Sequence, residues 1–177
     1  MTLSDLASIG SLVSSAAVLV SLVYLSLQLR QADRNQQASI RLGRSTRFVE
    51  IGIACTEPSL AVAIAKGMAG DSDMTATQVI QFNHFVTVHL HDAEDAFYQH
   101  RDGLLNESAY ATFTNSWRWV LSMPGWRAVW RRRRVIFVGE FLHFMDRIAA
   151  ETAVVPVTDS LAQWNADVAA EKASAAQ

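Results

Sequence analysis

The sequence predicts an all-α protein in which one N-terminal transmembrane helix continues into a helical bundle. Two observations lead to this prediction. Residues 6–29 contain no charged side chain. Beyond residue 47, apolar side chains recur every three or four residues, which is the period of one face of an α-helix. No segment alternates apolar and polar residues over the length that a β-strand needs.

The apolar stretch 6–29 is long enough to cross a membrane. A helix rises about 1.5 Å per residue, so the stretch extends over roughly 36 Å, against about 30 Å for a bilayer core. Residues 1–5 contain no lysine or arginine. Five arginines follow the stretch: Arg30, Arg34, Arg41, Arg44 and Arg47. Because positive residues stay on the cytoplasmic side, we expect residues 1–5 outside and the bundle inside; a cleaved signal peptide, which begins with a basic region, is disfavoured.

Small and polar residues form a stripe along this helix. They are spaced by four, three, four, three and four residues: Gly10, Ser14, Ala17, Ser21, Tyr24 and Gln28. This spacing is typical of the contact face of left-handed helix pairs, and small residues on such a face let two backbones approach closely in lipid. We therefore expect this seam to contact a second copy or another membrane protein. The alternative is that the serines bond to their own helix and face lipid.

The basic segment 30–47 is polar on nearly every side and contains no proline, so it is expected to continue the same helix out of the membrane. Its five arginines against one acid suit the anionic head groups of the inner leaflet. A nucleic-acid-binding arm is the disfavoured alternative, because the whole chain carries a net charge of only −2.

Residues 48–151 are predicted to form one small helical domain. A helix ends near Cys55, and Pro58 begins a short one that stops between Gly67 and Gly70. Thr75 followed by Gln78 resembles a capping box at the start of a long helix, expected over about residues 76–101 and ended by Gly103.

Three further helices are expected over about residues 107–122, 126–134 and 137–150. Pro124-Gly125 is expected to break the chain between the first two. Residues 152–177 are predicted to be a linker followed by a helix or tail, in which Thr158 or Asp159 caps a helix that reaches about residue 170.

The pattern of reactive residues argues against catalysis. The chain has one cysteine, which excludes an internal disulfide and a thiolate metal cluster. It has no Gly-x-Ser-x-Gly motif and no glycine-rich loop that would bind phosphate. We therefore expect no cofactor.

A metal site is the competing hypothesis. His91 and Asp95 are four residues apart on the long helix, and Glu140 and His143 have the Glu-x-x-His spacing that di-metal helical bundles use. A second Glu-x-x-His pair is missing, because His91 and Glu94 run in the reverse order.

Glu94 is expected to lie close to the apolar face of its helix, where a carboxylate needs a partner. Arg127 or Arg133 is the expected partner, in an ion pair that ties the long helix to the helix rich in tryptophan and arginine. The tryptophans around the run Arg131–Arg134 have the spacing of core residues, which disfavours binding of single-stranded nucleic acid.

Two blocks of residues resemble a known group of proteins. The blocks are Glu-x-x-Phe-Tyr-Gln and Pro-Gly-x-Arg-x-x-Trp with nearby residues, and they comprise Glu94, Phe97, Tyr98, Gln99, Gly103, Pro124, Gly125, Arg127, Trp130 and Arg133. Together with the apolar stretch, over about residues 9–150, they resemble an uncharacterised family of bacterial single-span inner-membrane proteins. The resemblance implies a bacterial inner-membrane location and implies no mechanism.

These observations favour a membrane-anchored accessory or scaffold subunit of a larger or homo-oligomeric inner-membrane complex, with no catalysis of its own. The alternative is a metal-dependent enzyme or a ligand sensor with a site in the cytoplasmic bundle. In the sensor, aromatic side chains would line the ligand site: Phe82, Phe97, Tyr98 and Trp117.

Overall fold

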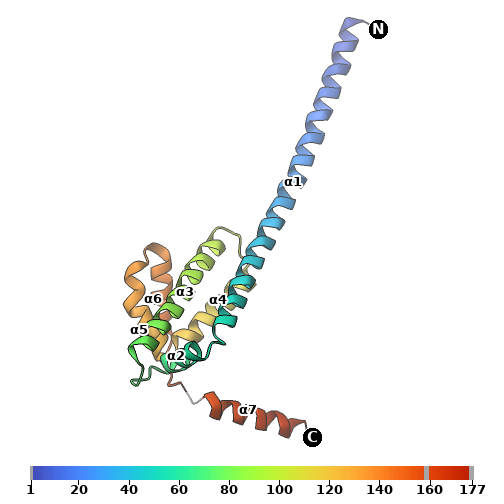
Figure 1. Ribbon diagram of the computed structural model, residues 1–177. Helices are drawn as coiled ribbons and strands as arrows, with labels where there is room; N and C mark the ends of the chain where they lie inside the picture. The colour runs from blue at the N-terminus through green and yellow to red at the C-terminus, as the bar shows by residue number, and fades with distance from the viewer. Residues whose placement is uncertain (1, 158–159, 176–177) are drawn as a thin grey trace. The chain divides into compact units, whose positions relative to one another are not determined.

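The computed structural model describes residues 2–157 and 160–175, and throughout these residues the regular structure is helical, which confirms the all-α prediction (Figure 1). The elements are α1 (Leu3–Ala54), α2 (Pro58–Ala69), α3 (Ala76–Arg101), α4 (Glu107–Leu121), α5 (Pro124–Arg133), the 3₁₀ turn η1 (Arg134–Ile136), α6 (Gly139–Glu151) and α7 (Ser160–Ser174). The predicted caps Thr158 and Asp159 lie outside the described residues.

The chain separates into two compact units, residues 1–47 and residues 48–177. The first unit consists of a single helical segment, because α1 is one helix of 52 residues that runs without a break from the apolar stretch through the basic segment. The second unit contains the end of α1 from Phe48 and the remaining helices. Within it, α3 is central and packs against α2, α4, α5 and α6.

Local sequence signals account for most helix ends. The predicted capping box of α3 is confirmed: the Thr75 hydroxyl accepts a hydrogen bond from the backbone N–H of Gln78, whose side chain accepts one from the backbone N–H of Thr75. Gly103, with φ of +74°, follows the end of α3. Asn106 caps α4 by accepting from the N–H of Ala109 at 2.9 Å.

The predicted break between α4 and α5 is present, but it lies at Ser122 and Met123, directly before Pro124 and Gly125. Pro124 and Gly125 lie in the first turn of α5 rather than in a break before it. Proline fits there because its fixed φ suits a helix. The N–H group that proline lacks would in any case have no hydrogen-bond partner within the helix at this position. A second interruption follows α5, where η1 separates it from α6.

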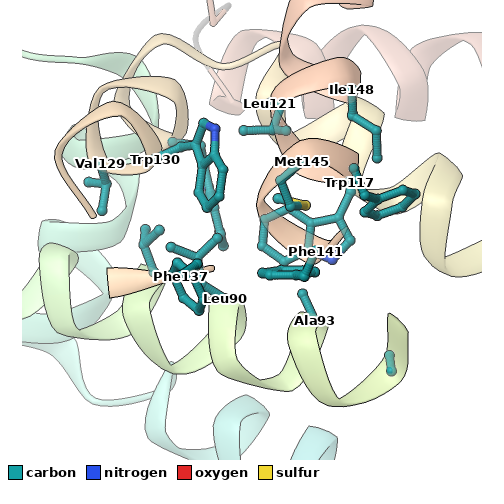
Figure 2. Close-up of a cluster of buried hydrophobic side chains, with 14 of the residues drawn as sticks. Leu90, Ala93, Trp117, Leu121, Val129, Trp130, Phe137, Phe141, Met145 and Ile148 are labelled. Carbon is teal, nitrogen blue, oxygen red and sulfur yellow. The ribbon is translucent and has the colours of Figure 1, made fainter. Parts of the chain in front are cut away.

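The core of the bundle lies where α3, α4, α5 and α6 meet (Figure 2). Leu90 and Phe141 are fully buried, and Trp130 is 1 % exposed. The rings of Trp130 and Phe141 pack edge to face at 6.4 Å between centroids, a favoured arrangement for aromatic pairs. Trp117 and Trp126 are also buried, as their spacing predicted, whereas Trp119 is exposed.

Two glycines let α2 and α5 pack at backbone distance. A Cβ atom on Gly125 would lie 1.6 Å from the carbonyl oxygen of Gly67, and one on Gly67 would lie 2.2 Å from the ring of Phe82. No side chain fits at either position without moving the helices. The close approach of α2 and α5 therefore requires glycine at position 125, and glycine at position 67 leaves room for the Phe82 ring of α3.

Candidate functional site

The apolar stretch of α1 is exposed along its whole described length. Every side chain from Ser8 to Ser39 is exposed, and within the unit of residues 1–47 none is covered by another described segment. A helix that is apolar on all sides is stable when it is surrounded by an apolar medium. In length and composition α1 is a candidate membrane-spanning helix.

The six seam residues share one exposed face of α1. A Cβ atom on Gly10 would have no neighbour within 4 Å. Two seam contacts are internal to the helix: the Ser21 hydroxyl donates to the carbonyl of Ala17 at 2.8 Å, and the Gln28 amide donates to the Tyr24 hydroxyl at 2.7 Å. The seam is therefore open to a partner helix, and its contact with one remains a prediction.

The five arginines of the basic segment lie on the same helix beyond the apolar stretch. Arg30, Arg34, Arg41 and Arg47 are exposed, and Arg44 is half-buried. Exposed arginines directly beyond an apolar span are positioned to contact anionic head groups if the span lies in a membrane.

Arg127 has a different partner from the one predicted. Its Nε donates to the carbonyl of Leu121 at 3.0 Å, and a terminal guanidinium nitrogen donates to the carbonyl of Thr152. These carbonyls lie at the C-terminal ends of α4 and α6, where helix acceptors lack partners and the helix dipole is negative. Burial, with the nearby charge of Arg131, lowers the pKa of Arg127. From α5, Arg127 thus holds the ends of two other helices.

The predicted ion pair of Glu94 with an arginine is not formed among the described residues. The carboxylate lies 3.6 Å from Nδ1 of His91 instead. The physical reason is exposure: the Glu94 side chain is 30 % exposed, so water solvates it and no buried cation is needed.

Asp146 of α6 forms an ion pair with Arg134 at the start of η1, which is a different connection from the predicted pair between α3 and α5. One carboxylate oxygen accepts from the indole N–H of Trp130 at 3.1 Å and from Nε of Arg134 at 3.0 Å, and the other accepts from a terminal nitrogen of Arg134. This bidentate geometry is strong and directional. The hydrogen bond and the negative charge of Asp146 raise the pKa of Arg134. The signal for Asp146 was the buried Trp130, whose N–H needs an acceptor.

The first family block closes the end of α3. The ring of Phe97 packs against Phe144 at 5.0 Å between centroids, and the Arg101 guanidinium lies 4.6 Å from the ring centre of Tyr98. The carbonyl of Gln99 accepts from the N–H groups of Leu104 and Leu105. In the second block, Pro124 begins α5, Gly125 contacts α2, and Trp130 lies in the core. These roles are structural.

The four proposed metal ligands do not form one site. The His91 ring packs on Phe137 at 5.2 Å, and Asp95 accepts from the Gln99 amide at 2.8 Å. Glu140 lies 3.8 Å from Arg101, and His143 is exposed. Over residues 2–157 and 160–175, no three side chains of histidine, cysteine, aspartate or glutamate lie close enough together to hold a metal ion.

The aromatic side chains of the sensor hypothesis pack in the core instead of lining a ligand site. Phe82 contacts Trp126 edge to face at 6.3 Å, and Trp126 contacts Trp117 in the same way at 5.7 Å. Aromatic rings at helical spacing bury large areas against one another, and this favours core packing over an open cavity.

No protein-family model, no curated protein and no solved structure matches this chain. The resemblance of the two blocks therefore stays a prediction, and the function has to be argued from the residues of the chain itself.

Proposed function

We propose that this protein is a membrane-anchored helical accessory subunit. In this proposal α1 crosses a bacterial inner membrane, residues 1–5 lie outside, and the bundle lies in the cytoplasm. The subunit associates through the seam with a second copy or with another membrane protein. It performs no catalysis of its own.

One observation supports the proposal above the others. Between Ser8 and Leu29, α1 exposes an uncharged and mainly apolar surface, whereas the bundle buries an apolar core that includes Leu90 and Phe141. Exposed apolar surface of this extent marks a membrane or protein contact. The exposed arginines from Arg30 onwards support a cytoplasmic bundle, because positive residues favour the cytoplasmic side of a membrane span.

The orientation is tested by labelling cysteines with a membrane-impermeant maleimide. Cys55 is replaced by serine first, so that the introduced cysteine is the only thiol in the chain. In this background, Thr2→Cys is expected to react in intact spheroplasts, and Ala153→Cys only in inverted vesicles. Equal labelling of both positions in spheroplasts would contradict the proposed topology.

Association is tested by cross-linking the full chain in native membranes. Ser14→Ile places a larger side chain on the seam, and Ser15→Ile makes the same change one residue away from it. Only Ser14→Ile is expected to reduce the cross-linked product, because small seam residues permit close helix approach. An equal yield from both variants and the unchanged chain would exclude the seam as the contact.

A further inference from the structure

Two grooves run along α3 and meet at Ile80 and His84. The first, called here the apolar groove, has a volume of about 590 Å³ and is formed by α1, α2 and α3 within residues 48–177. Its apolar lining includes Ile51, Leu60, Ile80, Phe85 and Val88. Ile80 is 59 % exposed and Val88 is 55 % exposed, so this face of α3 is uncovered.

The second, called here the cationic groove, has a volume of about 500 Å³ and lies between α3 and the end of α5. Arg132 and Arg133 line it together with Asn83 and His84, and none of its lining residues is acidic. Both volumes lie within the range of small-molecule sites.

The positive charge of the cationic groove is not neutralised within the described residues. Ion pairs are formed by Arg101, Arg118 and Arg134, whereas Arg132 and Arg133 form none with the described side chains. The Nε of Arg133 is also buried and has no acceptor. A buried donor without an acceptor is costly, and an anionic oxygen is the group that would satisfy it best.

From the two grooves together, we infer that the bundle binds a single-chain anionic lipid. The acyl chain lies in the apolar groove, and the phosphate of the head group lies against Arg132 and Arg133. A hydrocarbon chain gains free energy by leaving water, and the planar guanidinium matches phosphate oxygens. The switch from apolar to cationic lining at Ile80 and His84 matches the switch from tail to head group in such a lipid.

This inference goes beyond the accessory role. All residues of both grooves belong to residues 48–177, so the site does not depend on α1 crossing a membrane. The occupant has to be apolar at one end and anionic at the other, which distinguishes a lipid from inorganic phosphate and from a neutral hydrocarbon.

The test is native mass spectrometry of the full chain in a non-ionic detergent, with oleoyl lysophosphatidic acid as the probe. One bound lipid per chain is expected. The double variant Arg132→Gln/Arg133→Gln is expected to weaken binding about tenfold for each arginine removed. Its matched control is Arg131→Gln/Arg147→Gln, which removes the same charge from arginines outside both grooves and is expected to bind like the unchanged chain.

The apolar groove is tested by Val88→Trp, which fills it, against Val138→Trp, which adds the same side chain at an exposed position outside both grooves. Only Val88→Trp is expected to lose the lipid. Melting curves of all variants are compared first, and because the substituted residues are outside the core, each is expected to fold.

Three outcomes would overturn the inference. The first is absence of binding by the unchanged chain. The second is equal weakening by the two arginine double variants, which would show general attraction to positive charge. The third is displacement of the lipid by inorganic phosphate at the same concentration, since that result would leave no role for the apolar groove. The neutral lipid mono-oleoylglycerol is expected to bind more weakly, and its binding is expected to be the same in the arginine variants as in the unchanged chain.

Discussion

Residues 1–47 and the bundle use the same kinds of apolar side chain in opposite ways. In α1, Leu12 and Leu19 are more than half exposed, whereas Leu90 and Leu121 of the bundle are fully buried. The difference lies in spacing: apolar residues surround α1 but occupy one face of α3. The bundle therefore supplies its own apolar environment, and α1 requires one from outside.

Polar groups show the same contrast. In α1 they bond within the helix, as when the Ser15 hydroxyl donates to the carbonyl of Ser11 at 2.9 Å. In the bundle some polar groups also bond between helices, as Trp130 does with Asp146. A helix that satisfies its polar groups internally is suited to lipid, whereas inter-helix bonds give a bundle one defined arrangement.

The largest effect is expected when charged side chains are placed in the apolar stretch of α1. The double variant Leu19→Arg/Leu22→Arg places two charges in the apolar stretch, at about 3 kcal/mol of insertion free energy each. We expect the protein to leave the membrane fraction on carbonate extraction while the bundle keeps its melting temperature. Leu42→Arg/Phe48→Arg, at exposed positions beyond the stretch, is the control. Retention of both variants in the membrane fraction would contradict the claim that the apolar stretch of α1 requires an apolar environment.

Trp130→Ala, in the core of the bundle, is expected to lower the stability of the bundle without changing membrane association. Removing a buried tryptophan should lower the free energy of unfolding by about 3–5 kcal/mol, measured by denaturant titration of the full chain with near-ultraviolet circular dichroism. Membrane extraction should not change. Leu22→Ala, on the exposed surface of α1, should leave the unfolding midpoint of the bundle unchanged; a large shift there would mean that the two units share a core.

Glycine substitutions sharpen the contrast between the units. Gly125→Ala should destabilise the bundle by about 3 kcal/mol, because overpacking against the Gly67 backbone forces α2 and α5 apart. Gly43→Ala has no neighbour within 4 Å and should stabilise α1 by up to about 1 kcal/mol. Thermal melting followed by circular dichroism distinguishes them, and a neutral Gly125→Ala would contradict the close helix contact.

A smaller effect on the bundle than that of Gly125→Ala is expected at Arg127. Arg127→Met removes two hydrogen bonds from a charged donor and should lower the free energy of unfolding by about 2 kcal/mol. Arg127→Lys should recover little of this, because one ammonium group does not reproduce the planar guanidinium. Arg131→Met removes an exposed neighbour and is expected to be neutral in the same denaturant titration; equal losses at both positions would exclude the helix-end role of Arg127.

Local signals in the sequence predicted the helices well. Thr75 and Gln78 predicted the start of α3, and the spacing of apolar side chains by three or four residues predicted helices beyond residue 47. The predicted start of α5 was two residues too late, because proline can either end one helix or begin the next. Only the neighbouring backbone decides between these two roles.

The candidate sites were less predictable. The sequence identified Glu94 as the acid in need of a cation, but Asp146 is the acid that forms a bidentate pair with an arginine, and the partner of Arg127 is backbone rather than carboxylate. Arg132 was recognised only as part of a basic run, and Arg133 as a candidate partner of Glu94. Their position on a groove beside Ile80 depends on how α5 ends against α3.

The sequence by itself determined the all-α class, the single uninterrupted α1 and the main helix starts, because these depend on periodicity and on bonds between residues at most four apart. Only the tertiary structure decided which acid meets which arginine, which glycines touch, and where the two grooves join. Those contacts depend on the rotation and crossing of helices, and a change of one residue in helix phase would exchange the partners.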